Sequence, residues 1–264
     1  MVDGASSFKL REHFADGSPP HDIRRVLIEE TPVAIEINGL GYAVMMATPS
    51  DLEDYALGFC LSEQLISSST EMAWAVATPV EAGGWVLRIQ MNSDSAAPLI
   101  ERVRLRLAEG SCGLCGIESL EQVMRPLPPV RSTLELQSEA IFRATSSLSD
   151  QQVLGKVTRA AHAAALCTPD GEIVLVREDI GRHNALDKLF GAAAREGFAV
   201  PNHFVVLTAR CSYELVQKAV VAQCPVLVTI SAASAMAEQQ AKKSNLRLIS
   251  LARSDSYLSH QIAL

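Results

Sequence analysis

The pattern of apolar and polar positions changes along the chain, and this change divides it into two parts. In the first part, short apolar or alternating runs predict strands at residues 33–37, 42–46, 72–78, 85–91 and 103–107. A single helix is predicted from Thr48 to about Gln64, because its apolar residues recur at helical spacing. Thr48, Pro49 and Asp51 indicate its start as a hydroxyl cap, a first-turn proline and a first-turn acid. The first part is therefore a small β-rich region that carries one helix.

The second part alternates between strands and helices. Two helices are predicted at residues 138–147 and 150–156, followed by a hairpin of 161–166 with 172–176 around Pro169-Asp170-Gly171. Apolar runs then predict strands at 173–177, 204–207, 226–230 and 246–251, separated by helices at 184–196, 213–222 and 235–243. This alternation is typical of a mainly parallel sheet that helices cover on both faces.

Proline and glycine clusters suggest where the parts begin and end. Residues 1–22 are expected to form a flexible arm, because residues 17–20 (Gly-Ser-Pro-Pro) interrupt regular structure. Residues 23–110 then form the β-rich domain, residues 111–130 a cysteine loop with a linker, and residues 131–264 the α/β domain. The proline-rich run at 126–129 is stiff and marks the boundary between them.

Composition narrows the class of protein. The chain has 264 residues, of which 48% are hydrophobic, so it can bury a sizeable core. Its net charge of −7 and the lack of a basic run argue against a nucleic-acid partner, although a nucleotide could still bind in one local pocket. Six cysteines in a chain of this length do not make a disulfide framework. With no signal peptide and no membrane-spanning run in the sequence, we expect a reducing, cytoplasmic location.

The most distinctive short motif is a pair of cysteines in a glycine-rich frame, Ser111-Cys112-Gly113-Leu114-Cys115-Gly116. Glycine leaves the backbone free to expose a sulfur, and a helix starting after the pair would favour a thiolate. Four interpretations stay open here: packed core cysteines, half of a zinc site, a redox couple, or a sulfur-carrying thiol. Cys60, Cys211 and Cys224 lie in apolar surroundings and are expected to be ordinary packing residues.

Polar clusters follow the predicted strands of the second part, and ligands bind at such strand ends in α/β sheets. The clusters occupy residues 178–184, 208–212, 231–234 and 252–255. A glycine turn that enters a helix suits a phosphate, and arginine adds a bidentate contact. The candidate ligands of these turns are Gly181, Arg182, His183, Asn184, Arg210 and Ser212. The alternative for the first cluster is a solvated helix cap, with His183 paired to Asp187 one turn later.

Two metal or redox classes can be tested against the sequence. A zinc deaminase needs H-x-E together with P-C-x-x-C. Here Ser111, not a proline, precedes the cysteine pair. His162 and His183 are followed two residues later by Ala164 and Ala185 instead of a glutamate, so the general acid/base is missing. A structural zinc site would need further ligands, and the sequence has no second cysteine pair. A thioredoxin-type couple would lie after an early strand of a βαβ unit, whereas this pair follows a β-rich region in mid-chain. We expect no metal site.

The motifs taken together resemble the formate dehydrogenase accessory sulfurtransferase family, FdhD. The resemblance runs from about Thr31 to Tyr257. It rests on Ile37-Asn38-Gly39, Thr48-Pro49, Leu57-Gly58-Phe59 with Ser62-Glu63, Cys112-Gly113-Leu114-Cys115-Gly116, the run from Glu178 to Lys188 (EDIGRHNALDK), and Ser212-Tyr213-Glu214.

This resemblance implies a fold and a function. The fold would be a cytidine-deaminase-like three-layer αβα sandwich, used without deamination, with a smaller β-rich N-terminal domain. The protein would be a sulfurtransferase that takes persulfide sulfur from a cysteine desulfurase and passes it to a molybdenum cofactor with two guanine dinucleotides, before insertion into the formate dehydrogenase apoenzyme. Cys112 would carry the persulfide and Cys115 would assist. GDP-like nucleotides would mimic the cofactor, and we expect a homodimer.

The cofactor-binding stretch of the family matches Leu251, Ala252, Arg253, Ser254, Asp255 and Ser256. The chain departs from the family pattern at four places. Arg159 and Ala160 stand where two glycines are usual, Ala233 replaces a proline, a glycine expected before the last strand is replaced near Ser244-Asn245, and Ser256 replaces an arginine. A function of a different class stays open beside sulfur transfer, namely a non-enzymatic chaperone that shields the cofactor. Such a chaperone would tolerate serine at both cysteines of the pair.

Overall fold

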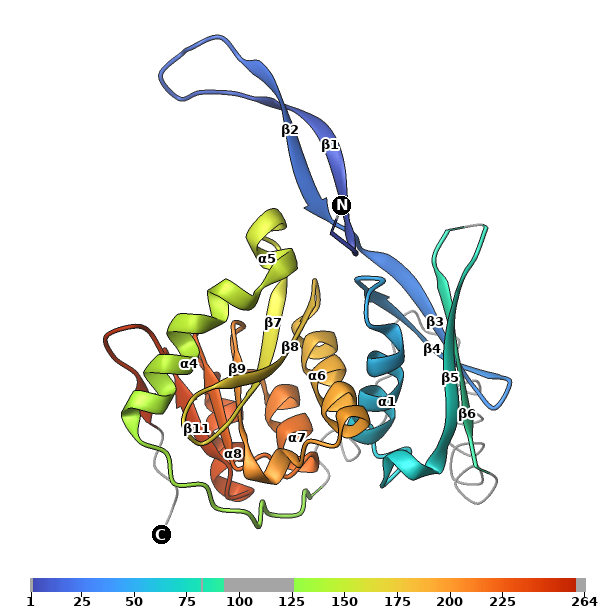
Figure 1. Ribbon diagram of the computed structural model, residues 1–264, viewed down its shortest axis with the longest axis vertical. Helices are drawn as coiled ribbons and strands as arrows, with labels where there is room; N and C mark the ends of the chain where they lie inside the picture. The colour runs from blue at the N-terminus through green and yellow to red at the C-terminus, as the bar shows by residue number, and fades with distance from the viewer. Residues whose placement is uncertain (1, 82, 93–125, 260–264) are drawn as a thin grey trace.

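A computed structural model of the protein describes residues 2–81, 83–92 and 126–259, and its strands form three separate sheets (Figure 1). The strands are β1 (Ala5–Glu12), β2 (His21–Ile28), β3 (Thr31–Ile37), β4 (Leu40–Ala47), β5 (Met72–Pro79), β6 (Trp85–Met91), β7 (His162–Cys167), β8 (Ile173–Asp179), β9 (Phe204–Leu207), β10 (Val226–Thr229), β11 (Arg247–Ser250) and β12 (Leu258–Ser259). The helices are α1 (Leu52–Ser62), α4 (Ser138–Gln151), α5 (Val153–Thr158), α6 (Arg182–Glu196), α7 (Tyr213–Val221) and α8 (Ala235–Lys243), with short 3-10 turns at Ser69–Glu71 and Val200–Asn202.

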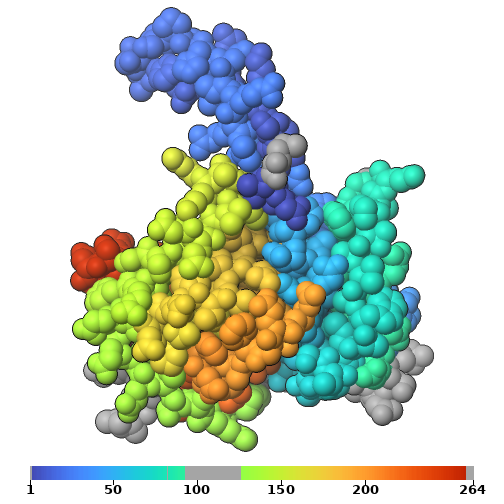
Figure 2. Space-filling view, viewed as in Figure 1, coloured from blue at the N-terminus to red at the C-terminus, as the bar shows by residue number. Residues whose placement is uncertain are grey.

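The N-terminal segment, expected to be a flexible arm without a regular element over residues 1–22, contains a hairpin. Strands β1 and β2 pair antiparallel from Ala5 opposite Ile28 to Glu12 opposite His21. The Gly-Ser-Pro-Pro run lies in the turn between them, where it reverses the chain. Most side chains of both strands are exposed, and the hairpin stands out from the body of the molecule (Figures 1 and 2). Its strands pair through backbone hydrogen bonds and exposed cross-strand contacts, such as Lys9 with Asp22, and no buried apolar face marks them in the sequence.

The β-rich region is a four-stranded sheet in the order β4-β3-β6-β5, with α1 packed on one face. The predicted strands at 33–37, 42–46, 72–78 and 85–91 are confirmed, and the one at 103–107 lies outside the described residues. The core of this region joins Val33, Ile35, Leu87 and Ile89 of the sheet to Tyr55 and other apolar residues of α1.

The second part contains a six-stranded sheet in the order β12-β11-β10-β9-β7-β8. The expectation of a mainly parallel sheet is only partly right. Strands β9, β10 and β11 pair in parallel, whereas β7 is antiparallel to both of its neighbours and β12 is antiparallel to β11. The predicted Pro169-Asp170-Gly171 hairpin is present, and it places β7 between β8 and β9. Because direction reverses twice, β8 still runs the same way as β9, β10 and β11.

Helices cover both faces of this sheet, which gives three layers in the order α, β, α (Figure 1). Helices α6, α7 and α8 pack on one face through residues such as Leu189, Leu215 and Ala237. Helix α4 packs on the other face through Ile141 and Leu148. The mixed α/β class is therefore confirmed, and the specific likeness to cytidine deaminases stays a prediction.

The two parts of the molecule meet where α1 crosses α6. A Cβ atom added at Gly58 would lie 1.7 Å from the carbonyl oxygen of Asp187, and one added at Gly191 would lie 1.8 Å from that of Asp54. Only glycine allows two helix backbones to approach so closely. The crossing therefore fixes the N-terminal sheet, through α1, against the helix that follows β8.

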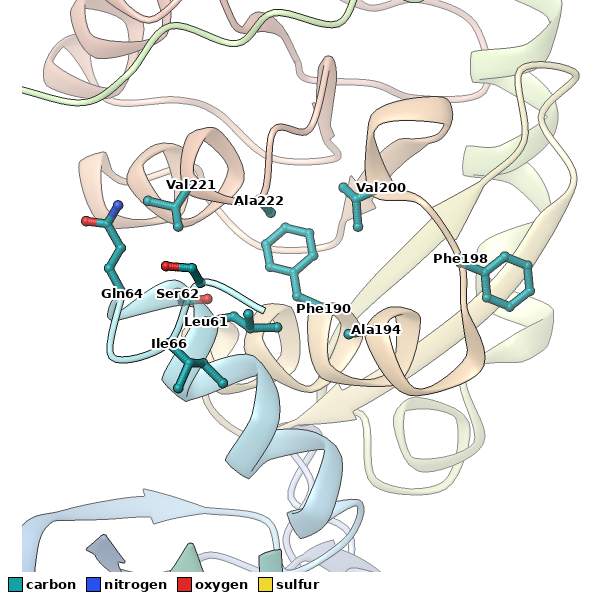
Figure 3. A pocket seen from close by; sticks show the side chains of 11 residues that line it. Leu61, Ser62, Gln64, Ile66, Phe190, Ala194, Phe198, Val200, Val221 and Ala222 are labelled. Carbon is teal, nitrogen blue, oxygen red and sulfur yellow. The ribbon is translucent and has the colours of Figure 1, made fainter. Parts of the chain in front are cut away.

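A cavity of about 300 Å³ lies at the end of α6 that is far from the strand ends. Leu61, Phe190, Phe198, Val200 and other mainly apolar residues line it (Figure 3). Helix α6 begins at Arg182 and contributes only its later turns to this cavity. The cavity is therefore separate from the predicted ligand edge. None of the helices in the described residues is both long and apolar enough to cross a membrane.

Candidate site at the strand ends

The turns that follow β8, β9, β10 and β11 lie side by side, as their positions in the sequence predicted. Two hydrogen bonds join the turn after β9 to the turn after β10. The N–H of Cys211 donates to the carbonyl of Ala232, and the carbonyl of Cys211 accepts from the N–H of Ser234, both at 3.0 Å. The N–H of Leu251 donates to the carbonyl of Ser231 at 3.2 Å. Nε2 of His183 lies 3.3 Å from Oγ of Ser212. Four polar clusters that are distant in sequence thus share one edge of the sheet.

The acidic residues of the run 178–188 face inward. The carboxylate of Glu178 accepts hydrogen bonds from the backbone N–H groups of Leu154 and Gly155, both at 2.8 Å. It therefore satisfies free donors at the start of α5. The carboxylate of Asp187, which is 2% exposed, accepts from Nζ of Lys218 at 2.9 and 3.0 Å. Burial raises the pKa of Asp187 and the nearby Lys218 opposes that change.

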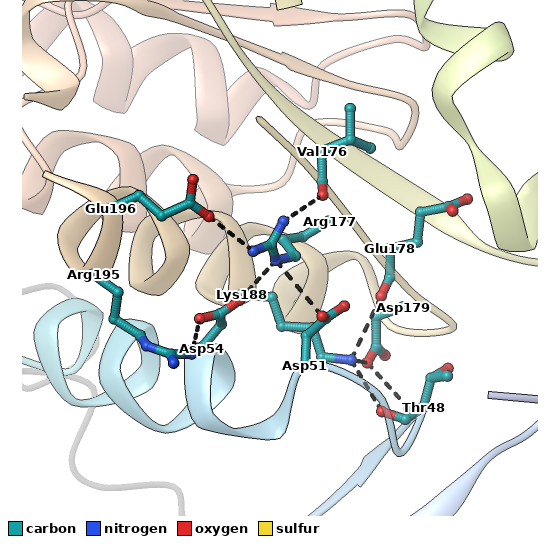
Figure 4. A network of polar contacts seen from close by, with 10 residues as sticks. All are labelled: Thr48, Asp51, Asp54, Val176, Arg177, Glu178, Asp179, Lys188, Arg195 and Glu196. Carbon is teal, nitrogen blue, oxygen red and sulfur yellow. Dashed lines mark hydrogen bonds and ion pairs between the residues drawn. The ribbon is translucent and has the colours of Figure 1, made fainter. Parts of the chain in front are cut away.

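Asp179 and Lys188 form a fully buried ion pair, with 2.7 Å between Oδ2 and Nζ (Figure 4). Neither side chain has any exposed surface. A buried pair of this kind is stable only when its other hydrogen-bonding positions are also satisfied. Here Lys188 also donates to the carbonyl of Thr48 at 3.0 Å, and Oδ1 of Asp179 accepts from the N–H of Gly181 at 2.7 Å.

The same network continues along the crossing of α1 and α6. Asp54 of α1, whose side chain is 5% exposed, accepts from Nε of Arg177 at 2.7 Å and from Arg195 at 2.5 Å (Figure 4). Arg177 also reaches Glu196 at 3.3 Å. These pairs join α1, β8 and α6.

Arg182 and His183 differ from the acidic residues and the lysine of the run, whose charged groups are held by interior hydrogen bonds or ion pairs. Nε2 of His183 lies 2.8 Å from Oε2 of Glu214, at the start of α7. The alternative pairing of His183 with Asp187 is wrong, because the carboxylate of Asp187 is held by Lys218. The hydrogen bond with His183 lowers the pKa of Glu214, against the opposing effect of burial. Glu214 was part of a recognised motif, but sequence reasoning did not identify it as a site residue.

Positive charge gathers at this edge. His162 begins β7, and its pKa is lowered first by burial and then by the charge of Arg182, with smaller contributions from His183 and Arg210. Nε of Arg182 is buried and has no hydrogen-bond partner among the described residues. Helix α6 begins at Arg182, and the residue before it, Gly181, has no side chain that could cap the first N–H groups. A buried donor without a partner is costly, and an anion would satisfy it.

Other predicted ligands have internal roles. The amide nitrogen of Asn184 donates to the carbonyl of Met46 at 2.8 Å and to Oδ1 of Asp179 at 3.0 Å, and the residue is 3% exposed. Gly181 is the N-cap residue of α6. Sequence reasoning missed Thr48, Asp179 and Lys188 as parts of this arrangement. Thr48 lies more than 130 residues from Asp179 and Lys188, so no local pattern could have shown that it contacts them.

The predicted cofactor stretch follows β11 at the same edge. Ala252 is buried and its N–H donates to the carbonyl of Thr229 at 3.1 Å, which anchors the start of the stretch. Leu251 adopts a left-handed backbone conformation with φ of 52°. Its later part is a turn with exposed side chains, closed by the N–H of Arg253 donating to Ser256 at 2.8 Å. Only this later part, which comprises Arg253, Ser254, Asp255 and Ser256, offers its side chains to a ligand.

Two residues in the regions where glycine was expected have left-handed backbone conformations. Arg159 has φ of 57° and Asn245 has φ of 55°. Asn tolerates this conformation better than arginine does, because its short side chain can hydrogen-bond locally. Both residues therefore have a backbone shape that glycine would adopt without strain.

The cysteines divide into two groups. Four of the six lie in the described residues, and all four are buried free thiols: Cys60, Cys167, Cys211 and Cys224. Burial raises their pKa, to about 12 for Cys211 and Cys224. The prediction that Cys60, Cys211 and Cys224 are packing residues is confirmed. Cys112 and Cys115 lie outside the described residues. Within the described residues, no group of three or more His, Cys, Asp or Glu side chains is arranged to hold a metal ion.

Known proteins are similar to this chain in sequence and in fold. The sequence model of the FdhD/NarQ family matches residues 28–260. A protein of Variovorax paradoxus (strain S110) named sulfur carrier protein FdhD is 44% identical over 234 residues, covering 89% of this chain and 84% of that protein. A protein of the same name from Xanthomonas euvesicatoria is 42% identical over 231 residues, covering 88% of this chain and 82% of its own.

A solved structure agrees at the level of the fold. A crystal structure of a protein named as a formate dehydrogenase accessory protein, from Desulfotalea psychrophila, superposes with a TM-score of 0.76. The superposition covers 97% of this chain and 96% of that one, at 20% sequence identity. The match to the family over most of the chain, together with relatives at 40% identity or more, shows that this chain belongs to the FdhD/NarQ family.

Proposed function

We propose that this protein is a sulfur carrier for the maturation of formate dehydrogenase. It receives sulfur from a cysteine desulfurase on Cys112 and delivers it to a molybdenum cofactor that carries two guanine dinucleotides. Relatives over most of the chain are named sulfur carrier protein FdhD, and a protein of the same fold is named as a formate dehydrogenase accessory protein. A cytoplasmic location and a homodimer belong to the same proposal.

The observation that carries the proposal is the burial of four of the six thiols. A persulfide carrier needs a thiolate that can reach two partners. Cys60, Cys167, Cys211 and Cys224 are at most 1% exposed, and burial raises their pKa so far that they remain protonated near neutral pH. Elimination leaves the pair Cys112 and Cys115, which lies in the glycine-rich frame.

The sulfur transfer balances as a simple exchange. The thiolate of Cys112 attacks the outer sulfur of the desulfurase persulfide, the S–S bond of that persulfide breaks, and the desulfurase thiolate leaves. Cys112 then holds the persulfide. No external oxidant or reductant is required, because one persulfide replaces another. Cys115, three residues after Cys112 in the sequence, would assist when the sulfur is released.

The cofactor is assigned to the strand-end edge. Its diphosphate groups need fixed positive charge and free N–H donors. The described residues fit this requirement through the unpartnered Nε of Arg182, the uncapped start of α6 at Gly181 and the charge of Arg210 near His162. Ser212 and the exposed residues Arg253 to Ser256 complete the proposed edge. The deaminase-like fold would then hold a nucleotide without deamination, because the H-x-E sequence is absent.

A second candidate function is a chaperone that binds the cofactor and transfers no sulfur. The test is rescue of formate dehydrogenase activity in cells that lack the protein. Cys112→Ser should abolish rescue, while Cys224→Ala, which shortens a buried thiol, should retain it. Binding of GDP, used as the probe, should be unchanged in Cys112→Ser. Rescue by the Cys112→Ser/Cys115→Ser double variant would favour the chaperone instead.

A further inference from the structure

The connection between β4 and α1 contacts the candidate site directly. Thr48, the first residue of this connection, is fully buried. Its N–H donates to Oδ2 of Asp179 at 3.1 Å, and its Oγ1 accepts from the N–H of Ile180 at 3.1 Å. Its carbonyl accepts from Nζ of Lys188 at 3.0 Å. Every polar group of Thr48 is therefore used to hold the turn between β8 and α6.

Asp179 is the centre to which these contacts lead. One of its oxygens accepts from Thr48 and Lys188, and the other accepts from the N–H of Gly181 and the amide of Asn184. Four donors thus surround one buried carboxylate. The turn from 179 to 184 has little freedom to change shape, because the side chain of Asp179 at its start bonds to Gly181 in its middle and to Asn184 at its end. Asn184 adds a second link to the N-terminal sheet through the carbonyl of Met46.

This arrangement explains the position of Arg182 and His183. Gly181, the residue before α6, has no side chain to cap the helix, and Asp179 makes the local contacts of the turn instead. Further contacts come from Thr48, in a segment more than 130 residues earlier in the chain. Thr48 had been expected to cap α1, yet that helix begins at Leu52 after Asp51. Its hydroxyl serves the candidate site.

We propose that Thr48, Asp179 and Lys188 are positioning residues, which hold the start of α6 so that Arg182 is aimed at the phosphate groups of the bound nucleotide. This inference rests on the proposed function, because it assumes that the strand-end edge binds a nucleotide. Thr48 itself touches no ligand and acts through Arg182. The N-terminal sheet therefore contributes to nucleotide affinity although it supplies no ligand-binding group.

The test is a double-mutant cycle on GDP affinity, measured by calorimetry well below the unfolding temperature. Thr48→Val keeps the shape of the side chain and removes the acceptor of the Ile180 N–H. It should weaken GDP binding about tenfold, and Thr48→Ser, which keeps the hydroxyl, should restore most of the affinity. In an Arg182→Ala background, Thr48→Val should change affinity less than threefold, because coupled residues are not additive. Thr48→Ala removes the same hydroxyl and serves as the second variant if Thr48→Val does not fold.

A ligand-free measurement separates this inference from the proposed function. The charged groups around His162 are Arg182 and His183 of α6, Arg210 before α7, and Asp179 of β8. If Thr48→Val lets Arg182 move away, the pKa of His162, followed by NMR, should rise toward its ordinary value. Ser244→Ala, at a buried hydroxyl after α8, should leave both the pKa and the GDP affinity unchanged.

The outcomes are distinct. If the unaltered protein does not bind GDP, the nucleotide proposal fails, and the His162 titration still decides whether Thr48 positions the turn. If GDP binds and Thr48→Val matches the unaltered protein in affinity and in His162 pKa, the positioning role is overturned. Additive losses in the cycle would also overturn it, since they would show that Thr48 does not act through Arg182.

Discussion

Replacing Gly58 with alanine tests whether the crossing of α1 and α6 holds the two parts of the molecule together. A Cβ atom at this position would lie 1.7 Å from the carbonyl oxygen of Asp187 and 2.8 Å from the backbone nitrogen of Gly191. Ordinary van der Waals contacts of a Cβ atom begin at 3.4 Å. The obstructing atoms belong to the backbone of α6, so no side chain can rotate away. The helices would have to separate.

The size of the effect follows from this geometry. Overpacking a core costs about 1–3 kcal/mol, and a clash with fixed backbone belongs at the upper end of that range or beyond it. Alanine regains up to about 1 kcal/mol through its better helix propensity. We therefore expect a net loss of about 2–3 kcal/mol. For a protein of this size, each kcal/mol lowers the unfolding temperature by roughly 2–4 °C, so the expected decrease is about 4–12 °C.

The assay is thermal and urea unfolding followed by circular dichroism. Gly41→Ala is the matched control, because an added Cβ there meets no atom within 4 Å and its backbone is not left-handed. We expect Gly41→Ala to stay within about 0.5 kcal/mol of the unaltered protein, as surface substitutions usually do. If Gly58→Ala unfolds together with this control, the helices are not in backbone contact and the reasoning about the crossing is wrong.

Other predictions concern the buried pair, the pKa of Glu214, the thiols and the left-handed residue. Lys188→Met should destabilise the protein by about 3–5 kcal/mol in urea unfolding, because it leaves Asp179 as a buried charge without its partner. Because the pKa of Glu214 is lowered, its pair with His183 stabilises the folded protein at any pH above the ordinary glutamate pKa. This stabilisation is lost as the pH falls through the lowered pKa. His183→Ala should raise the pKa of Glu214, which NMR can measure. Arg159→Gly should stabilise the protein by about 1 kcal/mol, since φ of 57° is unfavourable for arginine; equal or lower stability would contradict this. In the folded protein, thiol reagents should not modify the four buried cysteines, Cys60, Cys167, Cys211 and Cys224. Rapid labelling of any one of them would show that it is not buried.

The sequence predicted those elements whose side chains alternate between a buried and an exposed face, or are buried throughout. Strand β9 was expected at residues 204–207 and is found there, because four consecutive apolar residues are fully buried between two helical layers. The location of the candidate site was also predictable. Strands that point the same way end at the same edge, so the polar clusters after β8, β9, β10 and β11 had to meet.

Features that depend on distant contacts could not be predicted. The side chains of the β1–β2 hairpin are mostly exposed, so no buried face marks its strands in the sequence. The predicted hairpin accounts for the antiparallel pairing of β7 with β8, whereas the antiparallel pairing of β7 with β9 leaves no local signal, because its apolar sequence is compatible with either direction. The internal roles of Asp179, Asn184 and Lys188 arise from contacts with Met46 and Thr48, which no local spacing encodes.

The central claim is that Cys112 carries sulfur, and mass spectrometry tests it most directly. The protein is incubated with a cysteine desulfurase and free cysteine, the thiols are blocked, and the peptides are analysed. The account predicts the mass of one additional sulfur atom on the peptide that contains Cys112, and no addition on the peptides of the buried cysteines. Additional sulfur found only on Cys60, Cys167, Cys211 or Cys224, or on no peptide at all, would contradict it.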